Sequence, residues 1–243
     1  MTSDGRRAAP SRGEPVLHDR SLAARLNRLR AGVLGANDGI VSVAGLVVGV
    51  AGATASSSAL LAAGVAGLVA GALSMAAGEY VSVSTQRDTQ EAVLAVERRE
   101  LAELPAEELD ELAGLYEGKG LPPALAREVA VALTAHDALR AHADAELGLD
   151  PDEVVSAWQA AWTSAGAFTA GALLPLLAVL LAPTAVRLPV CVVAVLAALA
   201  LTGTVSARLG GAPRLRAALR TTAGGGLAMA VTYLVGRLVG TAL

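Results

Sequence analysis

Five long apolar segments constrain this chain more than any other feature of its sequence. The hydrocarbon core of a bilayer is about 30 Å thick, so about 20 helical residues are enough to cross it. Hydrophobic residues make up 54% of the 243 residues, which is more than an ordinary soluble domain carries. We therefore predict an all-α membrane protein with five transmembrane helices, at residues 32–53, 59–85, 160–181, 189–207 and 221–242.

A strongly acidic segment separates the second predicted span from the third. Residues 86–152 contain 16 acidic and six basic residues, whereas the whole chain has a net charge of −3. Pro105 suits the first turn of a helix and Gly148 suits the end of one. We expect three cytoplasmic helices here, over 86–103, 105–117 and 123–147. The predicted organisation is a disordered tail at 1–20, membrane helices at 21–85, the acidic domain at 86–152 and membrane helices at 153–243.

The arginines predict the orientation of the chain in the membrane. They are frequent before the first span and in the 208–220 connection, but absent from the 54–58 connection. Positive charge is retained on the cytoplasmic side of a membrane, so the N-terminus and residues 86–152 should be cytoplasmic and the C-terminus outside. The Ala, Gly and Arg content with a single lysine is typical of a GC-rich bacterial genome, which predicts a bacterial cell membrane as the location.

Small residues recur every four positions within the first two spans. Glycines occupy positions 35 and 39, 45 and 49, and 67 and 71. This spacing lets two helices approach closely. The contact could lie within one chain or across a dimer interface.

Two acidic residues lie inside predicted spans. Asp38 is in the first and Glu79 is in the second, with Met75 one helical turn before Glu79. A charge at the bilayer centre costs about 2.5–3.5 kcal/mol, so such residues usually face a cavity or an ion path. A thioether favours soft transition metals. The alternatives are an interfacial position for Asp38 and Glu79 and ordinary packing for Met75.

The acidic domain contains a set of potential ligands at helical spacing. Its glutamates form two pairs three residues apart, and a histidine precedes a further glutamate by four. If the three helices converge, these carboxylates and the imidazole form a site suited to Fe²⁺, Mn²⁺, Co²⁺ or Zn²⁺. Taken alone, this spacing is a weak signal, and it favours a solvated acidic surface over a metal site. The six residues are Glu97, Glu100, Glu108, Glu111, His142 and Glu146.

The sequence argues against an enzyme. An intramembrane serine protease needs a histidine within the spans, but His18, His136 and His142 all lie outside them. A di-iron oxidase needs Glu-x-x-His pairs, and the sequence has none. We expect no catalytic residues, no permanently bound cofactor and no nucleic-acid partner.

Two motifs on consecutive spans resemble the vacuolar iron transporter family, which includes Ccc1-type and nodulin-like proteins. They are residues 35–42 (Gly-Ala-Asn-Asp-Gly-Ile-Val-Ser) and 67–82, which contains Ser-Met-Ala-Ala-Gly-Glu-Tyr. The resemblance covers about residues 20–243. It implies five spans, a cytoplasmic helical domain and a homodimer with an ion path between the first spans of its protomers. It also implies export of Fe²⁺, often with Mn²⁺, from the cytosol in exchange for protons.

The resemblance assigns roles to individual residues. Asp38, Met75 and Glu79 match the family's transport path. The metal-binding glutamates of the family are spaced three, eight and three apart, which Glu97, Glu100, Glu108 and Glu111 reproduce, and Glu146 matches a further ligand. The family's best-described member has methionines three and four residues before that last glutamate. Here those positions hold Ala143 and His142, so His142 is the candidate replacement ligand.

The expected function is export of a divalent transition metal, Fe²⁺ or Mn²⁺ with Zn²⁺ and Co²⁺ as further candidates, by proton antiport. The cytoplasmic glutamates would collect the metal, and protons would compete with it for carboxylates on the path. The expected partners are metal ions, protons, the lipid bilayer and a second copy of the chain. A passive metal channel and a membrane-anchored metal sensor are the alternatives.

Overall fold

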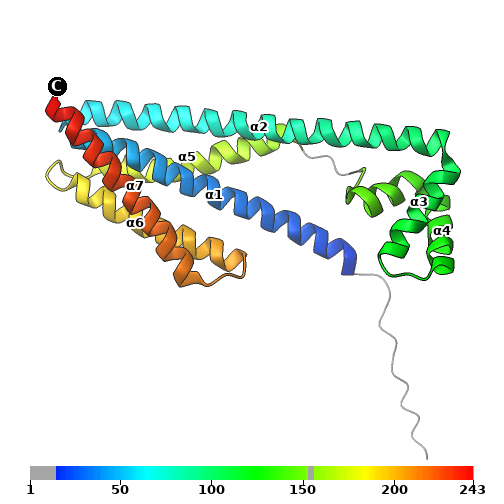
Figure 1. The fold of residues 1–243 in the computed structure, drawn as a ribbon. Coiled ribbons are helices and arrows are strands. Elements are labelled where there is room, and N and C mark those ends of the chain that lie inside the picture. The colour runs from blue at the N-terminus through cyan, green and yellow to red at the C-terminus, as the bar shows by residue number, and fades with distance from the viewer. Residues whose placement is uncertain (1–14, 153–155, 243) are drawn as a thin grey trace, which may run out of the picture. The chain divides into compact units, whose positions relative to one another are not determined.

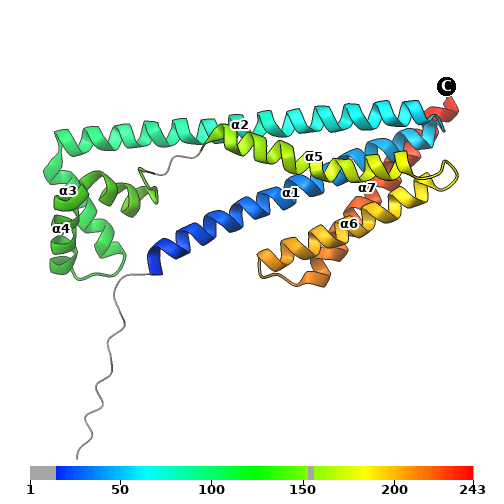
Figure 2. The ribbon, with the colours of Figure 1, turned by 180° about the vertical axis from the view of Figure 1, so that it is seen from behind.

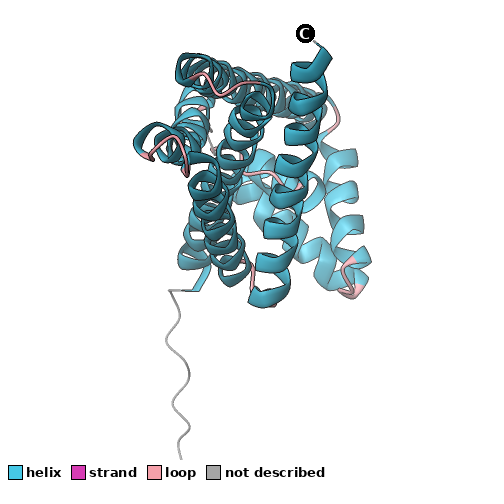
Figure 3. Cartoon of the chain, turned by 90° about the vertical axis from the view of Figure 1, so that its left-hand side faces the viewer, coloured by secondary structure: helices cyan, strands magenta, loops and turns pink. Residues whose placement is uncertain are grey.

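The computed structural model describes residues 15–152 and 156–242, with their side chains from residue 32 onward. Within these ranges all regular structure is helical (Figures 1 and 3). Five helices are long and apolar enough to cross a membrane. The predicted fold class, an all-α membrane protein with five spans, is therefore confirmed.

Seven α-helices and one short π-helix make up the described chain. The five predicted spans fall in α1, α2, α5, α6 and α7. The chain folds into two compact units, which we call the membrane bundle (residues 1–76 and 162–243) and the acidic domain (residues 77–161). The elements are α1 Pro15–Ala53, α2 Ser57–Glu103, α3 Pro105–Gly118, α4 Pro123–His142, η1 Ala143–Leu147, α5 Ala157–Leu181, α6 Arg187–Leu209 and α7 Arg214–Ala242.

The predicted disordered tail at 1–20 is too long at its C-terminal end. Residues 1–14 lie outside the described part of the chain, but residues 15–20 belong to α1. Proline is tolerated in the first turn of a helix, and the leucines, alanines and arginines after Pro15 are strong helix formers. Local helix propensity therefore outweighs the polar composition of this segment.

The core of the membrane bundle is built on α1. Ile40, Val43, Ala44 and Val47 of this helix are almost completely buried. They belong to one apolar cluster with residues of α5, α6 and α7, including Phe168. The helices α1, α6 and α7 pack against one another (Figure 2). The first span is therefore a central helix of the bundle.

Glycine allows the backbones of this bundle to touch. A Cβ atom on Gly39 would collide with the Phe168 carbonyl oxygen of α5, and one on Gly171 of α5 would collide with the carbonyl of Ala36. Further along α1, a Cβ atom on Gly236 of α7 would overlap the Gly49 carbonyl. The predicted small-residue contacts along α1 therefore lie within one chain.

The acidic domain has a much smaller apolar core, formed by Leu112, Ala113, Ala130 and Ala141. Its boundaries follow the predicted signals. Pro105 is in the first turn of α3, and Gly148 has a left-handed φ of 63° immediately after η1. Glycine adopts this conformation without the steric penalty of a side chain.

The prediction of one regular helix over 123–147 is wrong. Asp137 is extended, with φ −161° and ψ 95°, and its carboxylate Oδ1 accepts a hydrogen bond from the Arg140 backbone N–H at 3.0 Å. This is the geometry of an N-cap, so the chain restarts a helix at this point. The last turn then widens into the π-helix η1.

Candidate metal site and ion path

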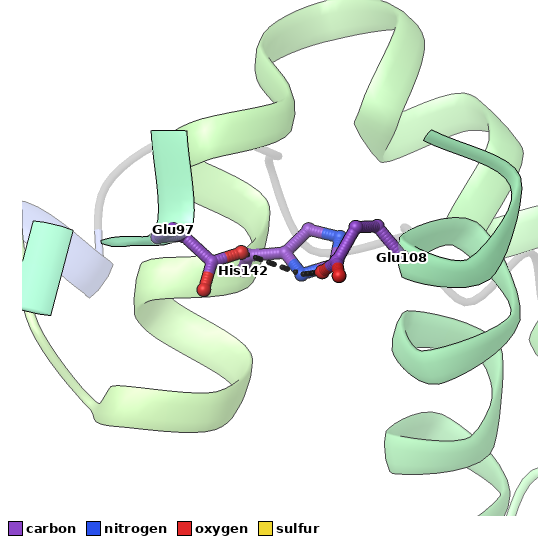
Figure 4. Close-up of side chains that lie close together, drawn as sticks. All are labelled: Glu97, Glu108 and His142. Carbon is purple, nitrogen blue, oxygen red and sulfur yellow. Dashed lines mark ion pairs between the residues drawn. The ribbon is translucent and has the colours of Figure 1, made fainter. Parts of the chain in front are cut away.

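Three helices of the acidic domain bring two carboxylates and an imidazole together. Glu97 comes from α2, Glu108 from α3 and His142 from the end of α4 (Figure 4). His142 Nδ1 lies 3.0 Å from Glu97 Oε1 and 3.6 Å from Glu108 Oε2. One potential ligand atom from each residue lies within 4.8 Å of the other two. We call these three residues the triad.

The triad is buried. The exposed fractions are 4% for Glu97, 7% for Glu108 and 0% for His142. Both ring nitrogens of His142 and Oε1 of Glu97 have no hydrogen-bond partner within the described chain, because the short contact lacks hydrogen-bond geometry. Buried polar atoms are nearly always satisfied. A cation among them would coordinate all three residues.

Burial sets the protonation of the triad. It is the main cause that raises the pKa of Glu97 from 4.5 to about 7, and the negative charges of Glu146, Glu108, Glu100 and Glu111 add to the effect. Burial also raises the pKa of Glu108 and lowers the pKa of His142. Without a cation, the Glu97 carboxyl group is therefore protonated in a substantial fraction of molecules near neutral pH, and burial favours a neutral His142 imidazole.

The other predicted ligands surround the triad. Glu100 is half-buried, whereas Glu111 and Glu146 are exposed. All three are close enough for their charges to raise the pKa values of Glu97 and Glu108. The structure thus gathers all six predicted side chains into one electrostatic cluster, with three of them at mutual ligand distance.

Basic side chains of the domain bind acids outside this cluster. Arg127 of α4 pairs with Asp110 of α3, and Arg140 contacts Asp150 and Asp152 at 2.9 and 3.0 Å. Within the described residues, no arginine or lysine forms an ion pair with the triad. A purely structural acidic surface would not need to bury carboxylates without a counter-charge.

Lysine and aspartate side chains position the element that carries His142. Lys119 Nζ donates a hydrogen bond to the Ala145 carbonyl at 3.2 Å and lies 5.1 Å from the centre of the Tyr116 ring. Together with the Asp137 cap, this contact fixes the end of α4 and the start of η1. Asp137 is a favoured N-cap residue type and stands three residues before Arg140, so the sequence is compatible with this cap, but the prediction of one helix over 123–147 did not include it.

The predicted path residues lie on α1 and α2. Asp38 is exposed on α1, and its Oδ1 accepts a hydrogen bond from Ser42 Oγ at 3.0 Å. Met75 is half-buried and packs against the bundle core. Glu79 is half-buried one turn later on α2. No described contact joins these three side chains, so their shared role stays a prediction.

Sequence reasoning did not identify two polar contacts within the bundle. Thr202 Oγ1 of α6 donates to Asn37 Oδ1 of α1 at 3.3 Å, which places a polar contact beside Asp38. Buried Arg187 donates to Ser57 Oγ at 2.9 Å and to the Ala55 carbonyl, and thereby holds the α1–α2 connection. Asn37 lies within the 35–42 motif, which could have indicated a polar contact there. Nothing in the sequence indicates that Arg187 contacts Ser57 and Ala55.

Comparison with known proteins places the chain in a family. Residues 29–237 match the model of the VIT family. The chain is 46% identical over 211 residues to a vacuolar iron transporter from Acanthamoeba castellanii, a match that covers 86% of this chain and 78% of the relative. It is 42% identical over 218 residues to vacuolar iron transporter homolog 1 from Oryza sativa, which covers 89% and 76%. Homolog 2 from Arabidopsis thaliana is 37% identical over 213 residues, covering 87% and 84%. With its five spans and these matches over most of its length, the chain belongs to the VIT family.

Proposed function

We propose that this protein exports Fe²⁺, and also Mn²⁺, from the cytosol across a cell membrane in exchange for protons. The observation that carries the proposal is the buried triad of Glu97, Glu108 and His142, which has unpaired ligand atoms and no basic counter-charge among the described residues. The names of relatives support the metal, because curated relatives are named vacuolar iron transporters. The carboxylates and imidazole suit a divalent transition metal.

Metal capture begins at the acidic domain, which faces the cytosol in this proposal. The outer glutamates Glu100, Glu111 and Glu146 raise the local concentration of cations by electrostatic attraction. The triad then binds the metal through Glu97, Glu108 and His142. Because the pKa of Glu97 is about 7, binding near neutral pH displaces a proton from its carboxyl group. The metal is held as cargo and passed on to the spans.

Asp38, Met75 and Glu79 form the transport path in this proposal. Asp38 is exposed on the single chain, as a path between the α1 helices of two protomers would require. Met75 supplies a soft ligand, and Glu79 supplies a carboxylate one turn away on α2. Protons that arrive from the far side compete with the metal for Asp38 or Glu79 and release it outward.

The test is metal flux in proteoliposomes made with the full-length protein. With an acidic lumen, Fe²⁺ and Mn²⁺ should enter the liposomes while lumenal protons leave, and the flux should fall when an ionophore collapses the proton gradient. Zn²⁺ and Co²⁺ serve as competing substrates. Metal flux that follows only the metal gradient and moves no protons would identify a passive channel. No flux, with metal binding retained, would favour a membrane-anchored sensor.

A further inference from the structure

The acidic domain contains a pocket that plays no part in the proposed metal site. It is lined by one face of α2, from Tyr80 to Glu91, and by the first residues of α5, including Trp158. Its volume is about 580 Å³, and it is open to the surface, since the side chains of Arg87 and Glu91 are 57% and 61% exposed. The lining side chains are therefore candidates for binding a molecule of moderate size.

The pocket offers charges of both signs. Arg87 Nε lies 2.7 Å from Glu91 Oε1, one helical turn away on α2. Asp88 also lines the pocket and forms no ion pair within the described chain. Ser84 adds a hydroxyl group on the same face. A guanidinium group and two carboxylates suit a ligand that carries both an anion and a hydrogen-bonding cation.

The aromatic lining is typical of a membrane interface. The rings of Tyr80 and Trp158 meet with their centroids 4.7 Å apart and their planes inclined by 50°. Trp158 is 62% exposed, and Trp and Tyr with one polar end are enriched at the level of lipid headgroups. The apolar part of α2 ends near residue 85, so the charged lining begins where the hydrocarbon region should end.

We propose that this pocket binds the phosphoethanolamine headgroup of a membrane phospholipid. The phosphate contacts Arg87 and Ser84, and the ammonium group donates hydrogen bonds to Asp88 and Glu91. The acyl chains leave along α2 past Val81, an exposed apolar residue on the membrane side of the charged lining. This inference does not depend on which ion the protein transports.

The charge arrangement favours this headgroup over its alternatives. A choline group has no N–H to donate to Asp88 and Glu91, and an anionic glycerol headgroup would place a phosphate beside those carboxylates without a balancing cation. A transition metal is a poor occupant because the lining contains the cationic Arg87 guanidinium group and offers no imidazole or thioether. Phosphatidylethanolamine supplies a phosphate for Arg87 and an ammonium group that can donate hydrogen bonds to the two carboxylates.

The test is lipid retention by the full-length protein, measured by native mass spectrometry after equilibration with equimolar phosphatidylethanolamine, phosphatidylcholine and phosphatidylglycerol. We expect phosphatidylethanolamine to be enriched about tenfold over phosphatidylcholine. The combined substitution Asp88→Asn with Glu91→Gln should remove that preference, and Arg87→Gln should weaken retention of every phospholipid. Arg98→Gln, on α2 but outside the pocket lining, is the matched control and should behave as the wild type.

Equal retention of phosphatidylethanolamine and phosphatidylcholine would overturn the proposal, as would a loss of preference in Arg98→Gln. Adding soluble glycerophosphoethanolamine distinguishes the source of the headgroup. If millimolar amounts displace the lipid, the pocket binds a soluble zwitterion, and the assignment to a membrane lipid is wrong. Ser84→Ala tests the phosphate contact even if the charge variants misfold. It leaves the charges intact and should still lower lipid retention. Unchanged retention in Ser84→Ala and Arg87→Gln together would contradict the phosphate contact.

Discussion

The membrane bundle and the acidic domain are both helical, but they are held together differently. In the bundle, glycines let α1 touch α5 and α7 backbone to backbone, and charged side chains are rare within the predicted spans. In the acidic domain, a core of four small or medium apolar residues is supplemented by ion pairs, one of which joins α3 and α4. Without water to drive apolar association, membrane helices depend on close packing, whereas the domain in water can depend on charge.

The two regions also differ in how their charged groups are compensated. The bundle has one exposed intramembrane aspartate, Asp38, with a hydroxyl partner. The acidic domain buries two carboxylates and an imidazole with unsatisfied atoms. Steric fit should therefore dominate mutational effects in the bundle, and protonation should dominate them in the domain.

The largest effect should come from a single methyl group in the bundle. Gly39→Ala places a Cβ atom on the Phe168 carbonyl, so α1 and α5 must separate, and we expect loss of the folded protein in detergent. Gly114→Ala in α3 is the matched control, because a Cβ atom there meets no atom within 4 Å. It should be neutral or stabilising by up to about 1 kcal/mol. Size-exclusion chromatography and thermal unfolding measure both, and equal behaviour of the two variants would remove the contrast between the regions.

Removal of the intramembrane carboxylate should separate transport from binding. Asp38→Ala should reduce metal flux in proteoliposomes to that of protein-free vesicles, because the path loses its charged ligand. Metal binding at the triad should persist, as measured by calorimetry. Ser42→Ala removes only the hydroxyl partner of Asp38 and should retain flux. Normal flux in Asp38→Ala would show that this aspartate is not on the path.

Removing the two carboxylate charges of the triad should weaken metal binding more than it lowers metal flux. Glu97→Gln with Glu108→Gln should weaken metal binding by more than about 100-fold, because loss of groups that merely orient metal ligands already costs about 10- to 100-fold. Flux at saturating metal should fall less than binding does. Glu128→Gln, an exposed glutamate on α4, is the control for general loss of negative charge. If it weakens binding as much, a diffuse acidic surface is responsible. Glu100→Ala with Glu111→Ala should give an intermediate loss.

The smallest predicted effect is a pH dependence. Because the Glu97 carboxyl group has a pKa of about 7, metal affinity should rise with pH and level off above about 7, changing by at most about tenfold per pH unit. The metal-free protein should show the opposite trend. A raised pKa contributes stability that is present below the usual 4.5 and is lost as the pH rises through about 7. Calorimetry in buffers of different ionisation enthalpy counts the released protons, and the Glu97→Gln variant should release fewer.

Much of the fold follows from the sequence, because hydrophobic length determines the spans and Pro105 and Gly148 mark helix ends in the acidic domain. The break at Asp137 was missed because its cause is one side-chain hydrogen bond to Arg140 N–H, which competes with a strong helical pattern. The start of α1 at Pro15 was missed because the polar composition of residues 15–20 predicted disorder, although the leucines, alanines and arginines that follow Pro15 have high helix propensity.

For the site, spacing identified the six candidate ligands but did not show which of them are buried at mutual ligand distance. Glu97 and Glu100 are equivalent in the pattern, yet Glu97 is buried and Glu100 is half-buried. The difference depends on how α3 and α4 pack against α2, and sequence spacing does not encode that packing. The unpaired state of the triad depends likewise on where Arg127 and Arg140 find their partners.

The π-turn of η1 has a consequence for how this family can change. A π-turn accommodates one residue more than an α-helical turn would. Such a turn can gain or lose one residue while the chain on either side keeps its position. His142 ends α4 and Glu146 lies within η1, so a one-residue change here would shift a carboxylate that now raises the pKa values of Glu97 and Glu108. The charge around the triad can therefore change while its three residues stay intact.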